Sequence, residues 1–558
     1  MKLHPPDRIQ LYTDAGYWGH PGWIELLNAH AQAMPDKVAI IDPPNLAALC
    51  DVEPRQCTWQ ELTTVVEHAA AVLHAAGIKA GDVVGVQLPN SVDQVVSYLA
   101  IVRLGAILTP FAMQLGQHEI EDMAQTTKMA AFISLARMGE RTPLADFTEY
   151  SAKIPSHPVI FAGSGTVPNG IESLHNRTEE AAPTRVADPN EAVTICWTSG
   201  TESKPKGVPR CTNDWRIMSI ASIDAAELTH DDVLLNPFPL VNMAGIAGML
   251  VPWLTTGATM LQHHPFDPPT FFMQIAKYRA TYTVAPPALL MMVLAREDIT
   301  AQMLSTLRVI SSGSAPLSPT MTNGWYDRFG IEIINAFGSN EGACIAGDPK
   351  SIPDHTTRAR LFPRFGSPDH QWLNRASHGM RTKLVNELGD EITDPQTPGE
   401  LRITGPGVFS GYLPGTAAEP FDKDGYFCTG DIFEYVSDDL GDLKFLRYVD
   451  RLKDIVNRGG QNISAAEIEG LLLGHPAISD VAVIAIPDDV MGERACAVVV
   501  SPDQAPTVQE VADFLHAQGV AKYKIPESIR QVVELPRNPV GKILKRQLRA
   551  EATSEATS

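Results

Sequence analysis

One segment of the chain combines glycines, hydroxyl groups and lysines at the density that a polyphosphate site requires. It reads Thr198-Ser-Gly-Thr-Glu-Ser-Lys-Pro-Lys-Gly207 and directly follows the apolar run 192–197. Glycine lets the backbone turn tightly and present N–H groups to an anion. Hydroxyls add donors that rotate to fit phosphate oxygens, and the two lysines add positive charge. The segment indicates a triphosphate-binding loop after a strand; taken alone, a polar surface turn is the alternative.

Residue spacing excludes two familiar nucleotide motifs. The Walker loop needs Gly-x4-Gly-Lys-Ser/Thr, and counting from Gly200 places Pro205 where the second glycine should stand. The segment Gly405-Pro-Gly-Val-Phe-Ser-Gly411 has one residue too many for the dinucleotide fingerprint. Neither a Walker NTPase nor a Rossmann dinucleotide site is therefore predicted.

The loop resembles the signature of the adenylate-forming superfamily, Thr-Ser-Gly-Thr-Thr-Gly-x-Pro-Lys-Gly, and departs from it at Glu202 and Ser203. This superfamily contains acyl- and aryl-CoA ligases, peptide-synthetase adenylation domains and luciferases. Seven further blocks resemble those of the family in the same order, and an ordered set of eight does not arise by chance. They are Phe238-Pro-Leu-Val-Asn-Met-Ala-Gly245, Ser312-Gly-Ser-Ala-Pro-Leu317, Asn335-Ala-Phe-Gly-Ser-Asn-Glu341, Gly407-Val-Phe-Ser-Gly-Tyr412, Gly425-Tyr-Phe-Cys-Thr-Gly-Asp431, Asp450-Arg-Leu-Lys-Asp454 and Asn538-Pro-Val-Gly-Lys542.

The resemblance implies a two-step reaction in the acyl-CoA synthetase branch, which includes fatty- and aryl-acid:CoA ligases. ATP first joins a carboxylate as acyl-AMP, and the thiol of coenzyme A then expels AMP. Both steps depend on positioning and charge stabilisation. Glu341 would hold Mg²⁺, Asn340 would donate to the α-phosphate, and Lys542 would neutralise charge during adenylation. Thr198 would join these catalytic residues from the phosphate loop.

The resemblance also implies a nucleotide site. Asp431 would accept from the ribose hydroxyls, Arg451 would contact ribose or phosphate, and Phe337 would lie against adenine. The remaining nucleotide residues that it implies are Ser199, Gly200, Thr201, Lys206, Ser314, Ala315, Pro316, Ala336 and Gly338.

The acid pocket is expected among small or apolar residues with one amide. No lysine or arginine stands among them to pair a second carboxylate, which predicts a neutral, hydrophobic acid. Asn242 replaces the histidine of the family and is the expected specificity residue. The pocket residues implied are Asn242, Met243, Gly245, Ser312, Gly313 and Cys344.

The family rotates a small C-terminal domain between the two half-reactions, and the resemblance places the hinge at Lys453. Gly459 and Gly460 would border the tunnel for the pantetheine arm. Arg458, Lys522 and Lys524 are the candidates for the phosphates of coenzyme A.

The elements that must position these motifs alternate between helices and apolar strands. Thr58-Trp-Gln-Glu61 has the form of a capping box and begins a helix, and Ser91 would cap a second helix. Apolar runs at 82–88 and 107–110 predict buried strands between the helices. This alternation indicates an α/β fold with crossover helices.

We expect a large N-terminal domain of layered β-sheets and helices over 1–451, and a small, mobile α+β C-terminal domain over 452–558. The run 481–486 predicts a strand of the small domain. The polar stretch 146–190 suggests surface excursions, and the end of the chain, 551–558, is expected to be frayed.

Composition limits the class of protein. The chain has 558 residues and a formal net charge of -21, which argues against non-specific nucleic-acid binding. Seven scattered cysteines without a CxxC pair favour reduced thiols and no zinc site. No signal-peptide h-region follows Met1, and the longest apolar run, 240–254, is too short to span a membrane. A cytoplasmic enzyme, monomeric or homodimeric, is expected.

Three alternatives to an ATP-dependent acyl-CoA ligase remain open. Gly16-Tyr-Trp18 is similar to the N-terminus of aryl-acid-activating relatives that load a separate carrier protein. Glu202, Ser203 and Asn340 suggest a relative that accepts a preformed acyl-adenylate with little use of ATP. A luciferase-like oxygenase shares the fold, whereas the intact catalytic set argues against a non-catalytic binding protein.

Overall fold

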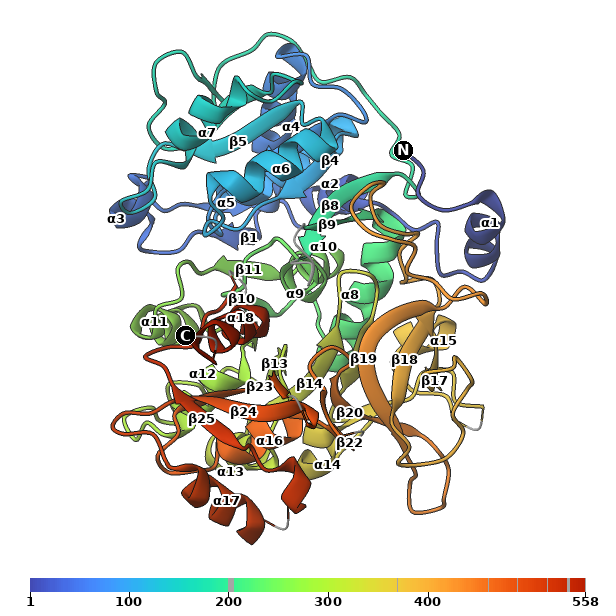
Figure 1. Ribbon diagram of the computed structural model, residues 1–558. Coiled ribbons are helices and arrows are strands. Elements are labelled where there is room, and N and C mark those ends of the chain that lie inside the picture. The colour runs from blue at the N-terminus through green and yellow to red at the C-terminus, as the bar shows by residue number, and fades with distance from the viewer. Residues whose placement is uncertain are drawn as a thin grey trace.

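The computed structural model describes residues 1–198, 205–368, 370–459, 461–488, 490–518, 520–538 and 542–556 (Figure 1). Three sheets and their helices form a large N-terminal part, and a fourth sheet, orange to red in Figure 1, lies against it. This confirms the expected α/β class with a large and a small domain. Among the described helices, none has both the length and the apolar character needed to cross a bilayer.

A seven-stranded sheet carries the strand that leads into the phosphate loop. All neighbouring pairs are parallel except β8 and β9, which run antiparallel on either side of that loop. The sheet order is β7 (Glu172–Ser173), β6 (Val159–Ser164), β5 (Ala131–Leu135), β3 (Val83–Val86), β4 (Ile107–Pro110), β8 (Ala192–Thr198) and β9 (Lys206–Cys211).

The stretch 146–190 corrects one expectation. It is not only a surface excursion, because β6 and β7 add two parallel strands to the edge of the seven-stranded sheet. Phe161 of β6 is fully buried in the main core. The strand is too short, and its neighbourhood too polar, to stand out as a periodic pattern.

An eight-stranded sheet carries the second group of predicted site residues. Its inner pairs are parallel, and antiparallel strands close both edges. Since the strands run parallel, their carboxyl ends meet at one edge. The order is β15 (Cys344–Gly347), β14 (Glu332–Gly338), β13 (Val309–Gly313), β12 (Tyr282–Val284), β10 (Val233–Asn236), β11 (Thr259–Gln262), β1 (Val38–Ile41) and β2 (Gln56–Thr58).

One core joins these two sheets through their helices. α4 (Trp59–Ala75) begins at the predicted capping box, in which the Thr58 hydroxyl accepts from the Glu61 amide and the Glu61 carboxylate accepts from the Thr58 amide. α5 (Val92–Leu104) begins at Ser91, also as predicted. Trp59 stacks on Trp253 with ring centroids 4.9 Å apart. The other helices of this part include α1 (Pro6–Asp14), α2 (Trp23–Ala33), α3 (Leu46–Cys50), α6 (Gln117–Thr127), α7 (Pro143–Ser151), α8 (Thr212–Ala226), α9 (Met243–Gly245), a π-helical turn (Ile246–Leu250) and α10 (Val251–Thr256).

The third sheet is antiparallel and holds the ribose-binding candidates. Its order is β16 (Leu361–Pro363), β20 (Phe445–Arg451), β19 (Phe427–Val436), β18 (Gly399–Thr404) and β17 (Arg381–Val385). Three helices of the large part share a hydrophobic cluster with the eight-stranded sheet: α11 (Pro268–Tyr278), α12 (Pro287–Leu294) and α13 (Pro319–Phe329). The remaining described helices of this part are α14 (His355–Arg360) and α15 (Ala376–Gly379).

The last hundred residues have hydrophobic clusters of their own, composed entirely of residues from Val456 onward. The C-terminal helix continues to Ala556. The prediction that the chain frays from residue 551 is therefore wrong for residues 551–556. The elements are β21 (Val456–Arg458), β22 (Gln461–Ile463), α16 (Ala465–Leu472), β23 (Asp480–Asp488), β24 (Gly492–Val500), α17 (Val508–Ala517), a 3₁₀ turn (Lys522–Lys524), β25 (Ser528–Gln531) and α18 (Lys545–Ala556). The boundary at residues 451 and 452 stays a prediction.

Candidate active site

The two ends of the phosphate loop lie side by side. Thr198 and Lys206 face each other in the antiparallel β8–β9 pair. The Lys206 ammonium lies 5.2 Å from the ring centroid of Tyr412, and the Gly207 carbonyl accepts from the Leu413 amide at 2.8 Å. The start of β9, where the chain leaves the loop, is therefore anchored on the segment that follows Gly411. Ser199, Gly200 and Thr201, like Glu202 and Ser203, lie outside the described residues.

Glu341 is buried and held at both its main chain and its side chain. Its carbonyl accepts from the Phe409 amide at 2.9 Å, and Oε1 accepts from the Tyr412 hydroxyl at 3.0 Å. Burial and the neighbouring Glu341 raise the pKa of Tyr412, which keeps the phenol protonated as a donor. Within the described part of the chain, no hydrogen bond reaches Oε2 of Glu341. A carboxylate with one oxygen available suits Mg²⁺, which prefers oxygen ligands.

Asp431 and Arg451 form the centre of the predicted nucleotide site. They stand opposite each other in β19 and β20, with Arg451 Nε 2.6 Å from Asp431 Oδ1. The two atoms make ion-pair contact without the alignment of a hydrogen bond. Among the described residues, the buried Oδ1 atom therefore has no hydrogen-bond donor. Burial raises the pKa of Asp431 to about 6 against the attraction of Arg451 and Lys542. An anionic acceptor with an unmet hydrogen bond is what a ribose hydroxyl would satisfy.

Lys542 comes from the C-terminal part and lies within electrostatic reach of Asp431. Its amide donates to Asn538 Oδ1 at 2.8 Å, and its carbonyl accepts from the Asn538 amide at 2.8 Å. Partial dehydration, with Arg451 and Lys453 nearby, lowers the pKa of Lys542 to about 8, although the residue still reaches solvent. Groups about a hundred residues apart in the chain thus converge here.

The adenine candidates lie at the ends of β13 and β14. Phe337 packs edge-on against Phe433 with ring centroids 5.0 Å apart. Ser314 has a φ of 73°, the left-handed conformation that the glycine of the family pattern would adopt freely. Ser314, Ala315 and Pro316 are exposed beyond β13. Ala336 pairs with Gly313 across the two strands.

Two predicted acid-pocket residues, Met243 and Cys344, come together around Gly338. A Cβ at Gly338 would lie 1.8 Å from the Met243 methyl group, so the methionine rests directly on this glycine. Asn340 Oδ1 accepts from the Met243 amide at 2.7 Å. Cys344 faces Gly338 in the β14–β15 pair, and burial raises its pKa to about 12. Asn340, a predicted phosphate ligand, therefore also connects to the acid site.

Three other residues predicted for the acid pocket do not belong to the group around Gly338. The Asn242 side-chain oxygen caps α9 by accepting from the Gly245 backbone amide at 3.3 Å. This bond gives the Asn242 side chain a structural role that does not require contact with a substrate. A Cβ on Gly245 would lie 2.2 Å from the Pro239 carbonyl oxygen. Ser312 shares a strand face with Ile310, which belongs to the cluster with α12 and α13, whereas Cys344 belongs to the main core. The Ser312 side chain is therefore on the face opposite Cys344.

The hinge and coenzyme A candidates occupy the start of the C-terminal part. Lys453 lies exposed in a turn after β20, and its carbonyl accepts from Arg549 at 3.3 Å. Arg458 pairs with Glu527 at 2.7 Å, so a phosphate would have to compete with that carboxylate. The Gly459 amide donates to the Met491 carbonyl at 2.7 Å. Gly460 lies outside the described residues.

The sequence motifs did not predict two features of the structure. Tyr412 is the last residue of the motif 407–412 but had no predicted role. Its phenolic hydroxyl is the feature of the sequence that could have identified it as a partner of Glu341. A cavity of about 300 Å³ lies elsewhere, between α2, the end of α5 and residues 185–193, and is lined by none of the site residues above. Motif order, rather than cavity size, is therefore what locates the site.

Comparison with known proteins agrees with this geometry. Residues 27–413 match the AMP-binding enzyme family, and residues 467–542 match the AMP-binding enzyme C-terminal domain. The chain belongs to the AMP-binding enzymes, and its class is that of adenylate-forming, acid-activating ligases.

Individual relatives differ in the thiol that their names specify. An indoleacetate–CoA ligase from Aromatoleum aromaticum is 32% identical, over 95% of this chain and 98% of its own. A salicyl-AMP ligase/salicyl-S-ArCP synthetase from Mycobacterium tuberculosis is 29% identical, over 98% and 93%. The structure of the anthranilate CoA ligase AuaEII in complex with anthranoyl-AMP has a TM-score of 0.80 at 22% identity, covering 97% of this chain and 98% of that one.

Proposed function

We propose that the protein activates a hydrophobic carboxylic acid with ATP and Mg²⁺ as acyl-AMP, and then transfers the acyl group to coenzyme A. The observation that carries this proposal is the convergence of Lys542 on Asp431 and Arg451. A lysine at this place would offset the negative charge that gathers on the carboxylate and α-phosphate during adenylation. Mg²⁺ on Glu341 would neutralise phosphate charge.

The same convergence supports a division of roles between two domains. Residues 1–451 would bind ATP and the acid, and residues 452–558 would supply Lys542. A lysine this close to the ribose candidates suits adenylation, whereas thiol transfer needs that space opened. Rotation about Lys453 would serve both steps with one site.

The acid would be neutral apart from its carboxylate. Met243, Gly338 and Cys344 surround the expected site with apolar or small groups. Fatty, alicyclic and aryl acids all fit this description. The names of the relatives include indoleacetate, salicylate and a medium-chain fatty acid, so aryl and fatty acids are both candidates.

Loading of a separate carrier protein is the second candidate for the thiol step. One relative is named for transfer to an aryl carrier protein, and the Arg458–Glu527 pair occupies a candidate phosphate ligand of coenzyme A. A carrier presents the same phosphopantetheine thiol without the nucleotide end of coenzyme A. The third candidate function is thioester formation from a preformed acyl-adenylate, with little or no use of ATP.

Two assays separate these possibilities. ATP–pyrophosphate exchange over a panel of fatty, alicyclic and aryl acids tests adenylation, and a single strong acid is the expected result. No exchange with any acid, alongside thioester formation from supplied acyl-AMP, would favour the third candidate. Thioester formation with coenzyme A and with a phosphopantetheinylated carrier then identifies the thiol.

A further inference from the structure

A tight turn, residues 405–408, has all four of its carbonyl groups bonded by groups distant in sequence. Arg8 Nη2 donates to Gly405 at 3.1 Å and to Val408 at 2.6 Å. Trp18 Nε1 donates to Pro406 at 3.1 Å. Arg210 Nη2 donates to Gly407 at 2.7 Å. Figure 1 shows α1, which carries Arg8, beside the loops of the β17–β18 end of the third sheet.

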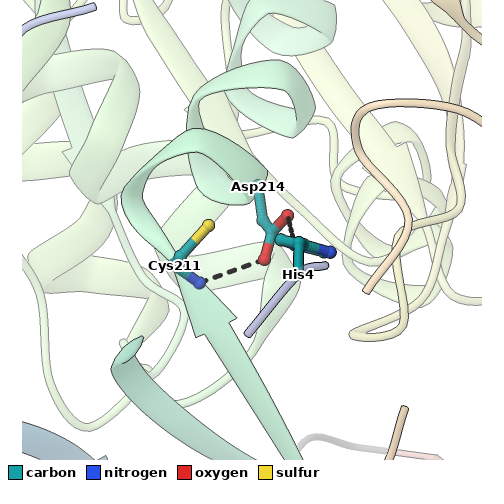
Figure 2. Close-up of side chains that lie close together, drawn as sticks. All are labelled: His4, Cys211 and Asp214. Atoms are coloured by element: carbon teal, nitrogen blue, oxygen red, sulfur yellow. Dashed lines mark hydrogen bonds and ion pairs between the residues drawn. The ribbon is translucent and has the colours of Figure 1, made fainter. Parts of the chain in front are cut away.

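The N-terminal segment that supplies two of these donors is itself fixed. Asp214 Oδ1 accepts from His4 Nε2 at 2.8 Å, and Oδ2 accepts from the Cys211 amide at 3.0 Å (Figure 2). Arg210 Nε lies 3.9 Å from Oδ2 of the same carboxylate. Asp214 therefore joins the N-terminal segment to the end of β9. We call residues 4–18 the strap.

His4, Cys211 and Asp214 could by type hold a metal ion, but their surroundings favour an ion-pair cluster. The fully buried Arg210 already supplies positive charge to Asp214. Burial raises the pKa of Cys211 well above its usual value, which keeps the thiol protonated. A second cation beside Arg210 would be repelled.

The turn 405–408 is in direct contact with the main chain at Glu341. Gly342 has a φ of 120°, and a Cβ there would lie 2.2 Å from the Gly407 carbonyl oxygen. Phe409, the next residue after the turn, donates its amide to Glu341, and Tyr412 donates its hydroxyl to the carboxylate. A shift of the turn would therefore act on the main chain at Gly342 and on Phe409, and through residues 410 and 411 it would reach Tyr412.

We propose that the strap positions Glu341 for its divalent cation by clamping the carbonyls of the turn 405–408. Arg8 and Trp18 are positioning residues, since neither touches the carboxylate. This inference rests on the proposed function, in which Glu341 binds Mg²⁺. It predicts that loosening the clamp weakens the cation-dependent step more than the step that needs no cation.

The test compares Arg8→Ala, Arg8→Lys and Trp18→Phe with the wild-type full chain. Arg296→Ala is the matched control, because Arg296 is an exposed arginine paired only locally with Asp298. Hydrogen–deuterium exchange of peptides covering 405–412 reports the clamp without any assay of activity. The half-saturating Mg²⁺ concentration in pyrophosphate exchange reports Glu341, and it does not depend on how much enzyme folds.

Arg8→Ala and Trp18→Phe are expected to speed exchange of the 405–412 peptides and raise half-saturating Mg²⁺ by about threefold to tenfold, the range for one or two lost hydrogen bonds. Arg8→Lys should fall between Arg8→Ala and wild type. Acyl transfer from supplied acyl-AMP should be unchanged in all variants. Where Arg8→Ala fails to fold, Trp18→Phe decides, because it keeps an aromatic ring and removes the Nε1 donor.

Faster peptide exchange with unchanged Mg²⁺ dependence would overturn the inference, as would an equal loss in both half-reactions. These results differ from failure of the proposed function. In that case the wild-type protein itself shows no pyrophosphate exchange with any acid.

Discussion

Arg451 Nε lies 2.6 Å from Asp431 Oδ1 across two neighbouring strands, and Lys542 of the C-terminal part lies within electrostatic reach of both. The carboxylate is 3% exposed and the guanidinium 32%. A buried acceptor is thus balanced by a cation that keeps contact with water. This asymmetry allows the acidic side chain to be changed without leaving a fully dehydrated charge behind.

Asp431→Asn should weaken ATP binding by about tenfold, because an amide is a poorer acceptor for ribose hydroxyls than a carboxylate. The loss of unfolding free energy should be modest, about 1 kcal/mol, since Arg451 remains partly hydrated. Titration of ATP in pyrophosphate exchange and chemical denaturation measure the two effects. Asp424→Asn, at an exposed carboxylate paired with Lys383, is the control. Unchanged ATP affinity would remove Asp431 from the nucleotide site.

The protonation of Lys542 should set the alkaline limit of adenylation. Its pKa of about 8 lies below the usual lysine value, so the free enzyme carries the required charge below pH 8 and loses it above. kcat/KM for pyrophosphate exchange should therefore fall above about pH 8. Bound ATP is anionic and favours the ammonium form, so the decline in kcat should begin at higher pH.

Lys542→Ala should lower pyrophosphate exchange by about 10²-fold and abolish this alkaline limb, while thiol transfer from acyl-AMP is largely kept. Lys542→Arg should move the limb to higher pH, because the guanidinium does not deprotonate. Normal exchange in Lys542→Ala would show that another group serves adenylation.

Gly338→Ala should disturb the acid site through Met243. The added Cβ would meet both the flexible methionine methyl group, at 1.8 Å, and the Ala343 carbonyl, at 2.9 Å. We expect a stability loss of about 1–3 kcal/mol and a raised KM for the acid. Adding Met243→Ala should restore part of the stability and part of the affinity for the acid. The restoration is partial because the contact with the Ala343 carbonyl remains. Equal KM values in the single and double variants would place the acid elsewhere.

Lys453→Pro should separate the half-reactions. Fixing φ in the turn after β20 restricts rotation of the C-terminal part. Strain of about 1–3 kcal/mol corresponds to a change of about 5-fold to 150-fold in rate. One half-reaction should slow much more than the other in single-turnover assays. Lys453→Ala, which keeps backbone freedom, is the control. Wild-type rates for both steps in Lys453→Pro would exclude a hinge here.

Much of the fold could be predicted from local patterns of residue types. The capping box of Thr58 and Glu61 and the cap at Ser91 are interactions over three residues, so the residue types alone predict them. The strand β23 was similarly visible as an unbroken apolar run. Ordered motifs placed Asp431, Arg451 and Lys542 in one site because they identify a shared fold.

Contacts between distant segments were not predictable in the same way. Nothing near Arg8 indicates that its partners are carbonyls almost 400 residues away, since backbone acceptors leave no trace in residue type. Asn242 shows the opposite case. Asparagine in place of the family's histidine suggested a role in substrate specificity. The structure gives this side chain a local role as well, since it accepts a hydrogen bond from the Gly245 backbone amide.

The clamp on the turn 405–408 also bears on how chimeric enzymes should be built from this chain. The matching family region begins at residue 27, so a graft chosen by that boundary would separate Arg8 and Trp18 from the carbonyls they bind. A recipient with another N-terminal sequence would lack these donors. Residues 1–19 and 405–416 should therefore be inherited from the same parent.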